Sequence, residues 1–218
     1  MTSEQFVAEL HEENRKRLER LALRSATGDA ADTLTVPRLL RLALRNELEA
    51  SELAAAWMTD TPEIDARLAL ARQCGDEAKH YRWIEARLAE LGDDLDGFDP
   101  TAPGPSPLLV YLRGLRGTVE RAAAGQFTRE AIAVVRNDVF ADFCAERGDE
   151  ATALLYRERI QPDEEHHHEL GRRLLLKYAT TPEAQAAARA AATRTLEVAE
   201  EIQELARLRA GVTRAPGC

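Results

Sequence analysis

The pentapeptides DEAKH (residues 76–80) and DEEHH (residues 163–167) decide how this sequence is interpreted. Both follow the pattern D-E-x-x-H, and each lies in a segment whose apolar periodicity predicts a helix. A glutamate and a histidine three residues apart project from the same face of a helix, so each pentapeptide can offer one carboxylate and one imidazole to a metal ion. Two such pairs on facing helices would supply four ligands of a dinuclear site. These ligands would be Glu77, His80, Glu164 and His167.

Helical periodicity extends outward from both motifs. We expect one helical hairpin over about residues 36–91 and a second over about residues 127–178. Between them, residues 92–107 (GDDLDGFDPTAPGPSP) contain four prolines and three glycines, which excludes regular structure there. No stretch alternates like a strand, so the predicted class is all-α. Two hairpins joined by a crossover favour a ferritin-like four-helix bundle with extra flanking helices.

The expected organisation has three parts: an N-terminal helical arm over residues 1–33, a di-metal bundle over residues 34–180 and a C-terminal helix and tail over residues 181–218. Thr61 and Pro62 are expected to cap and start the second helix of the first hairpin. Pro162 is expected to kink or end the first part of the helix that carries the second motif.

Glu47 is the carboxylate expected from the first helix of the first hairpin. Glu47 and Glu77 each lie 15 residues from Pro62 at the turn, so their side chains should lie at one level of an antiparallel pair. The neighbours of Glu47 on its helix face are apolar, and a buried carboxylate without a partner is costly. A bound metal ion would remove that cost.

The second hairpin offers two candidates for the remaining carboxylate. Glu130 lies 34 residues before Glu164 and nearly level with it, and we favour it for that reason. Asp138 is the rival, because the triplet Arg136-Asn137-Asp138 echoes Arg45-Asn46-Glu47.

Two further choices concern the motifs themselves. Glu165 and His168 have the same spacing as Glu164 and His167, but aspartate does not precede Glu165, so this pair ranks lower. The aspartates of the motifs have a predicted role as well, because a metal-bound histidine usually donates its other N–H to an acceptor. We expect Asp76 to orient His167 across the bundle and Asp163 to orient His80.

Composition limits the partners of the protein. The net charge is −9, from 29 basic and 38 acidic side chains, whereas proteins that bind duplex DNA or anionic membranes are usually basic. The three cysteines, Cys74, Cys144 and Cys218, form neither a disulfide framework nor a zinc pattern. No apolar run has the length of a membrane span, and the first residues lack a secretory signal. We therefore expect a cytoplasmic protein that binds neither nucleic acid nor membranes.

The doubled D-E-x-x-H motif, with a carboxylate upstream of each copy, resembles the ferritin-like di-iron carboxylate superfamily over about residues 36–178. The pattern is most similar to its non-cage oxidases and oxygenases. This resemblance implies two iron ions, with Mn/Fe or Mn/Mn as alternatives, that activate O2 to oxidise or hydroxylate a small organic substrate with electrons from a donor such as a reductase. The implied ligands are Glu47, Glu77, His80, Glu130, Glu164 and His167.

Two other functions use the same sequence features. One is a ferroxidase or other iron-handling protein, and the other is a structural helical bundle whose site is vestigial. The expected flanking helices and proline-rich crossover would cover the ends of the bundle. They favour a monomer or a small homo-oligomer such as a dimer over a cage.

Overall fold

The computed structural model describes residues 1–27, 34–212 and 214–217. Every regular element in these ranges is helical, which confirms the all-α prediction. Over the same ranges, no helix combines the length and apolar character needed to cross a bilayer. The elements in chain order are α1 (Ser3–Thr27), α2 (Val36–Asp60), α3 (Ile64–Glu90), α4 (Pro107–Arg113), α5 (Thr118–Ala122), the π-helix η1 (Ala123–Arg129), α6 (Glu130–Glu146), α7 (Glu150–Leu155), the π-helix η2 (Tyr156–Ile160), α8 (Gln161–Tyr178) and α9 (Pro182–Ala210).

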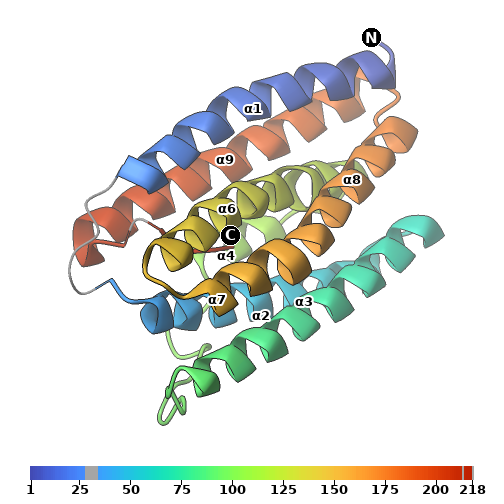
Figure 1. Ribbon diagram of the computed structural model, residues 1–218. Helices are drawn as coiled ribbons and strands as arrows, with labels where there is room; N and C mark the ends of the chain where they lie inside the picture. The colour runs from blue at the N-terminus through green and yellow to red at the C-terminus, as the bar shows by residue number, and fades with distance from the viewer. Residues whose placement is uncertain (28–33, 213, 218) are drawn as a thin grey trace.

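The helices are arranged in layers around the pair formed by α6 and α8 (Figure 1). On one side, α2 and α3 form an antiparallel hairpin; on the other, α1 and α9 lie side by side. Arg17 of α1 binds Glu200 of α9 at 2.8 Å. Helix α1 also packs against α6 and α8, while α9 packs against α5 and η1. Helices α6 and α8 of the second hairpin are therefore enclosed by the flanking helices as well as by the first hairpin.

The turn of the first hairpin differs from the sequence-based expectation. Thr61 ends α2 instead of capping α3: its backbone N–H donates to the carbonyl oxygen of Trp57 at 3.0 Å, and its hydroxyl donates to the same oxygen at 2.8 Å. Helix α3 begins at Ile64, and Glu63 before it makes no side-chain cap. The Thr61 hydroxyl thus hydrogen-bonds to the end of α2 and does not accept from a backbone N–H at the start of α3.

The second hairpin is formed by two continuous helical runs, residues 118–146 and 150–178. Gly148 between them has a φ of +77°, a left-handed conformation that glycine adopts without strain. Asp149 then caps the second run by accepting a hydrogen bond from the backbone N–H of Thr152 at 3.0 Å.

Pro162 was expected either to kink its helix or to end the first part of it, and it does not end the helix. The turn before it, η2, is wide, and the backbone N–H of Gln161 donates to Tyr156, five residues earlier. A π-helical turn contains one residue more than an α-helical turn, and such turns are frequent at functional sites. The wide turn accommodates the missing N–H of Pro162 within a helix that continues to Tyr178.

Gly171 permits the close approach of α8 to η1. A Cβ atom at this position would lie 2.4 Å from the backbone nitrogen of Phe127 and 2.7 Å from the carbonyl carbon of Gln126. Both atoms belong to backbone, which cannot move aside as a flexible side chain can. The absence of a side chain at Gly171 therefore sets the distance between η1 and α8. Segment η1 leads directly into Glu130, and α8 carries Glu164 and His167.

Candidate metal centre

Six acidic and imidazole side chains meet in the interior of the protein. They come from α2, α3, α6 and α8, and each is at most 4% exposed. They form two groups of four residues, in each of which one ligand atom per residue lies within 4.8 Å of the others. Glu77 and Glu164 belong to both groups. The first group adds Glu47 and His80, and the second adds Glu130 and His167.

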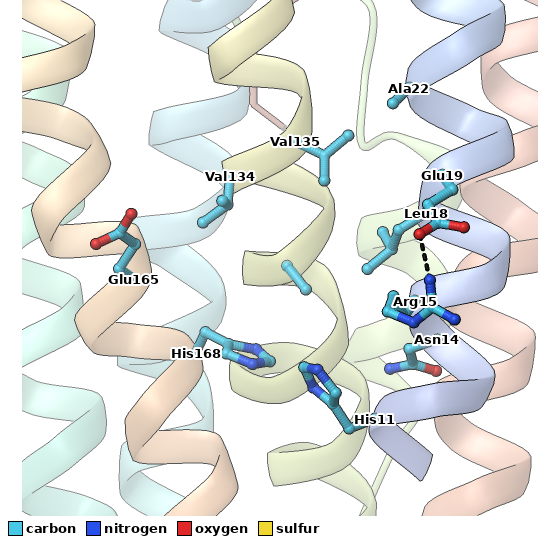
Figure 2. A pocket seen from close by; sticks show the side chains of 11 residues that line it. His11, Asn14, Arg15, Leu18, Glu19, Ala22, Val134, Val135, Glu165 and His168 are labelled. Atoms are coloured by element: carbon cyan, nitrogen blue, oxygen red, sulfur yellow. Dashed lines mark hydrogen bonds and ion pairs between the residues drawn. The ribbon is translucent and has the colours of Figure 1, made fainter. Parts of the chain in front are cut away.

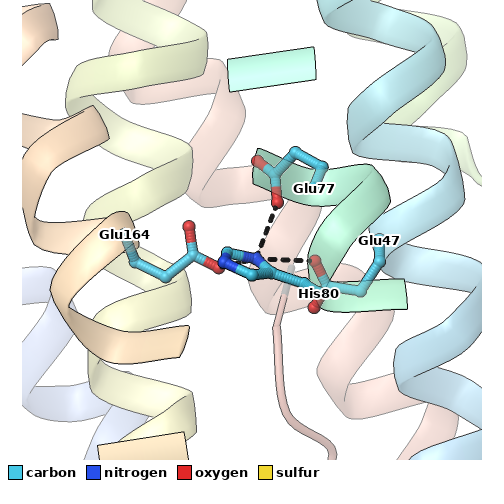
Figure 3. A group of neighbouring side chains, drawn as sticks. All are labelled: Glu47, Glu77, His80 and Glu164. Atoms are coloured by element: carbon cyan, nitrogen blue, oxygen red, sulfur yellow. Dashed lines mark ion pairs between the residues drawn. The ribbon is translucent and has the colours of Figure 1, made fainter. Parts of the chain in front are cut away.

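In the first group, His80 presents its Nδ1 atom to three carboxylates (Figure 3). This nitrogen lies 3.3 Å from Glu77 Oε2, 3.4 Å from Glu47 Oε2 and 3.7 Å from Glu164 Oε1. Nevertheless, it is a buried atom without a hydrogen-bond partner among the described residues. The donor atoms converge on the space between them, as expected for atoms that coordinate a cation.

The second group has the same construction. His167 Nδ1 lies 3.2 Å from Glu164 Oε2 and 3.7 Å from Glu77 Oε1. Both histidines therefore direct the same ring nitrogen toward the two glutamates that the groups share. The arrangement can hold two cations side by side with Glu77 and Glu164 between them.

The aspartates of the motifs contact the histidines across the bundle, in the pairing expected from the sequence. His80 Nε2 lies 3.2 Å from Asp163 Oδ2, and His167 Nε2 lies 3.3 Å from Asp76 Oδ2. When Nε2 of a neutral imidazole donates its proton, Nδ1 carries the lone pair. Each aspartate thus favours the tautomer that can bind a metal through Nδ1.

Lys79 links the two aspartates. Its Nζ atom lies 2.9 Å from Asp76 Oδ1 and 2.9 Å from Asp163 Oδ2. Hydrogen bonds from His167, and then from Lys79 and Arg72, hold the pKa of Asp76 well below its usual range despite partial burial. The side chain of Lys79 occupies a variable position of the first motif, so the D-E-x-x-H pattern did not indicate this contact.

Buried amides that neither motif indicates hold Glu130 in place. Gln73 Nε2 donates to Glu130 Oε1 at 2.6 Å, and Gln126 Nε2 donates to Gln73 Oε1 at 2.9 Å. Arg129 Nη1 also lies 3.1 Å from Glu130 Oε1. The available signal was the spacing of Gln73, which lies four residues before Glu77 and therefore on the same helix face.

The carboxylates titrate as a buried, crowded group. Burial raises the pKa of Glu47 to about 7 and raises the pKa values of Glu130 and Glu164. Burial acts in the same direction on Glu77, but the His80 imidazole 3.3 Å away and the other positive charges nearby lower the pKa of Glu77 to about 2. Without metal, protons must therefore offset part of the negative charge of the four carboxylates.

The histidines carry the compensating positive charge in the metal-free protein. Burial alone would lower the pKa of His80, but Glu47 and Glu77 raise it to about 12. For His167, the contacts with Asp76 and Glu164 outweigh burial and raise the pKa to about 11. Metal binding to such a site must displace these protons, which couples metal affinity to pH.

The rival ligands lie outside the cluster. Asp138 is exposed on α6, and its Oδ1 accepts a hydrogen bond from Gln161 Nε2 at 3.0 Å. Glu165 is also exposed, and His168 Nδ1 contacts the carbonyl oxygen of Phe127 at 2.7 Å. The geometry thus favours Glu130 over Asp138, and Glu164 with His167 over Glu165 with His168.

The echo between residues 45–47 and 136–138 has a different structural basis from the one expected. Its two asparagines hold the C-terminal segment: Asn46 Nδ2 donates to the Pro216 carbonyl at 3.0 Å, and Asn137 Oδ1 accepts from the Gly217 N–H at 2.8 Å. A Cβ atom on Gly217 would lie 3.9 Å from Glu47 Oε1, so this segment lies directly against the candidate centre.

Tyr156 is a further residue close to the cluster. Its side chain is 1% exposed and packs edge-on against Phe140, with 4.8 Å between ring centroids. Its hydroxyl is buried and has no hydrogen-bond partner among the described residues. Burial raises its pKa well above the usual value, and the charges of Glu47, Cys144 and Glu164 add to that shift.

Comparisons with known proteins identify the fold. Neither a scan of protein-family models nor a search of curated proteins finds a match. Among solved structures, the protein is similar to the crystal structure of a TenA homolog from Pseudomonas syringae pv. tomato str. DC3000, with a TM-score of 0.60 and 16% sequence identity. The match covers 88% of each chain.

This similarity corrects the family suggested by the motifs. The identification as a ferritin-like di-iron protein is wrong, because the structure resembles a TenA homolog over most of its length. The physical reason is visible in the packing: α1 contacts α6 and α8, and α9 contacts α5 and η1, so the flanking helices belong to the same packed unit as the four ligand-bearing helices. The D-E-x-x-H spacing specifies which side chains share a helix face, but not how many helices surround them. The chain has the all-helical fold of this TenA homolog.

Proposed function

We propose that the protein is an oxidoreductase in which the six clustered side chains hold two transition-metal ions, which activate O2 to oxidise or hydroxylate a small organic substrate. The observation that carries the proposal is the pair of overlapping donor groups that share Glu77 and Glu164. A single-ion site would need neither the second histidine nor the second pair of carboxylates. Two iron ions are the first choice, and Mn/Fe or Mn/Mn centres suit the same donors.

Charge supports a pair of divalent ions. The four glutamates supply four negative charges when ionised, and two divalent cations neutralise them in a region from which water is excluded. When bound, such ions would supply the electrons that O2 requires for activation. Each group contains four protein ligands, fewer than the six of an octahedral ion, so coordination positions remain for O2 or substrate.

The surrounding side chains have defined tasks in this proposal. Asp76 and Asp163 hold the imidazole rings with Nδ1 directed inward, and Lys79 fixes the spacing of the two aspartates. Gln73 orients the Glu130 carboxylate by donating to one of its oxygens. These contacts limit the movement of the ligands when the charge of the metal ions changes.

The electron balance of the reaction defines the required partners. Hydroxylation inserts one oxygen atom of O2 into a C–H bond of the substrate, and two electrons and two protons convert the other atom into water. The electrons must come from a reductant, either a reductase or a small molecule. A two-electron oxidation of the substrate by O2 would instead release hydrogen peroxide and needs no further donor.

The first experiment measures metal content and O2 consumption together. The chain is loaded with Fe(II) in the absence of oxygen and freed of excess metal, and its iron content is measured by mass spectrometry. O2 uptake is then followed with a reductant other than dithionite and a panel of small organic substrates. We expect two iron ions per chain, and substrate-dependent O2 uptake with the iron retained. Glu130→Ala should reduce the iron content, and Asp138→Ala is the matched control that should not.

The alternatives give different results in the same experiment. A ferroxidase would oxidise repeated additions of Fe(II) without an organic substrate, and the oxidised iron would leave the chain. A vestigial site would retain no iron above the level of the Glu130→Ala variant.

A cytoplasmic location and a monomeric or dimeric state, which the sequence suggests, stay predictions.

A further inference from the structure

A cavity of about 340 Å³ lies between α1, α6 and α8, separate from the candidate metal centre (Figure 2). Ala131, Glu165 and His168 in its wall each follow a candidate ligand by one residue. Successive residues of a helix point about 100° apart, so the cavity adjoins a different face of α6 and α8 from the one that carries the ligands. Its volume falls within the range of small-molecule sites, about 300–1,000 Å³.

Most of the cavity wall is apolar. Leu18 and Ala22 contribute from α1, and Ala131, Val134 and Val135 contribute from α6. None of these side chains can hydrogen-bond, so a ligand must present an aliphatic or aromatic body to them. The small side chains Ala22 and Ala131 provide the room for that body.

The opposite end of the cavity carries a hydrogen-bond acceptor. His168 and His11 face each other there, with 6.2 Å between ring centroids (Figure 2). His168 Nδ1 donates to the carbonyl oxygen of Phe127 at 2.7 Å, and the ring stacks on Phe127 with 4.7 Å between centroids. Since Nδ1 of His168 carries the proton, Nε2 of the neutral ring has a lone pair.

The charges that line the cavity favour a cation. Arg15 is the basic side chain of the lining, and it is already engaged by Glu12, at 2.7 Å, and by Glu19. Glu165 makes no hydrogen bond or ion pair within the described residues. It lies one helical turn before His168, and both side chains line the cavity (Figure 2). An anionic ligand would meet the unpaired carboxylate of Glu165, whereas a cationic donor can bind to Glu165 and to His168 Nε2.

We propose that this cavity binds a small primary amine whose ammonium group donates to Glu165 and to His168 Nε2, and whose aliphatic or aromatic body lies between α1 and α6. The site is independent of the metal centre and of the proposed oxidation, because no candidate metal ligand lines the cavity.

Three probes of similar size test the proposed charge preference by isothermal titration calorimetry of the full-length chain. They are 2-phenylethylamine, the neutral 2-phenylethanol and the anion phenylacetate. We expect the amine to bind at least about tenfold more tightly than the alcohol, with the anion weakest, because a hydrogen bond to a charged group is stronger than a neutral one. Comparable affinities for the amine and the alcohol, or no binding of the amine at millimolar concentration, would overturn the proposal.

Variants locate the probe. Glu165→Gln should weaken amine binding about tenfold and leave alcohol binding unchanged. The matched control is Glu158→Gln, at an exposed glutamate two turns earlier on the same helical run. An equal loss of amine affinity in this control would show that only the net charge of the chain matters, and would contradict direct contact with Glu165. Ala131→Leu fills the cavity from α6 and Ala22→Leu fills it from α1. The melting temperature shows which of these two variants folds like the parent chain. That variant should lose affinity for both the amine and the alcohol, and unchanged affinity would refute binding in this cavity.

Metal loading separates this site from the proposed metal centre. Amines can bind transition metals directly, so the titrations are run with and without bound iron. Equal amine affinity in both states supports the separate cavity. Binding that requires iron would place the probe at the metal centre and refute this proposal, while leaving the proposed oxidation intact.

Discussion

If Asp76 and Asp163 orient the ligand histidines, replacing each aspartate should weaken the binding of a different metal ion. Asp163 contacts His80, which belongs to the group with Glu47, and Asp76 contacts His167, which belongs to the group with Glu130. Asp163→Asn keeps the shape of the side chain and removes its charge. It should therefore weaken binding of the ion beside His80 and leave the ion beside His167 close to its original affinity.

The expected size of the effect follows from the environment of Asp163. Removing such an orienting contact typically lowers metal affinity by about 10- to 100-fold. The Asp163 side chain is 18% exposed, and Lys79 keeps its second partner, Asp76, in the variant. Solvent weakens the contribution of a partly exposed charge, so we expect the lower end, about tenfold, which corresponds to about 1.4 kcal/mol.

A competition titration with a chromophoric chelator resolves the two affinities. The parent chain, Asp163→Asn and Asp76→Asn are compared, with Asp138→Asn as the control for loss of an exposed aspartate on α6. Equal weakening of both ions by Asp163→Asn, or a change no larger than that of the control, would refute the reasoning.

Three other predictions concern stability and access to the centre. Gly171→Ala should lower the free energy of unfolding by about 1–3 kcal/mol in urea, because the added Cβ meets backbone atoms; a change under about 0.5 kcal/mol would contradict the close packing of α8 on η1. The metal-free chain should lose thermal stability as pH rises from 6.5 toward 9, since the pKa of His80 is raised from 6.5 to about 12 and its stabilising contribution is complete only below 6.5; stability that increases over this range would contradict the assignment. Asn137→Ala removes the acceptor for the Gly217 N–H and should speed the loss of metal to a chelator without changing the metal content at saturation, and an unchanged rate would show that this contact does not limit access.

The sequence predicted the local geometry of the site far better than the packing around it. Helical spacing and the midpoint at Pro62 were enough to align Glu47 with Glu77, because antiparallel helices of equal rise bring such positions level. The doubled aspartates likewise indicated the cross-bundle contacts with His80 and His167. These inferences succeed because they depend only on the regular repeat of the helix.

Other features could not be read from the sequence. The wide turns η1 and η2 insert residues into apparently regular helices, and no motif marks them. Gln73 and Lys79 are common surface residues, and only tertiary packing makes them partners of Glu130 and of the two aspartates. The same reason explains the wrong family: the D-E-x-x-H motifs say nothing about α1 and α9, whose packing distinguishes this fold.

Anomalous diffraction at the iron absorption edge, from crystals of the chain loaded with Fe(II), tests the central proposal most directly. We predict two peaks inside the cluster, with Glu77 and Glu164 contacting both, and with His80 and His167 each contacting one through Nδ1. A single peak, or iron bound only at residues outside the cluster such as the half-buried His166, would contradict a dinuclear centre at these six side chains.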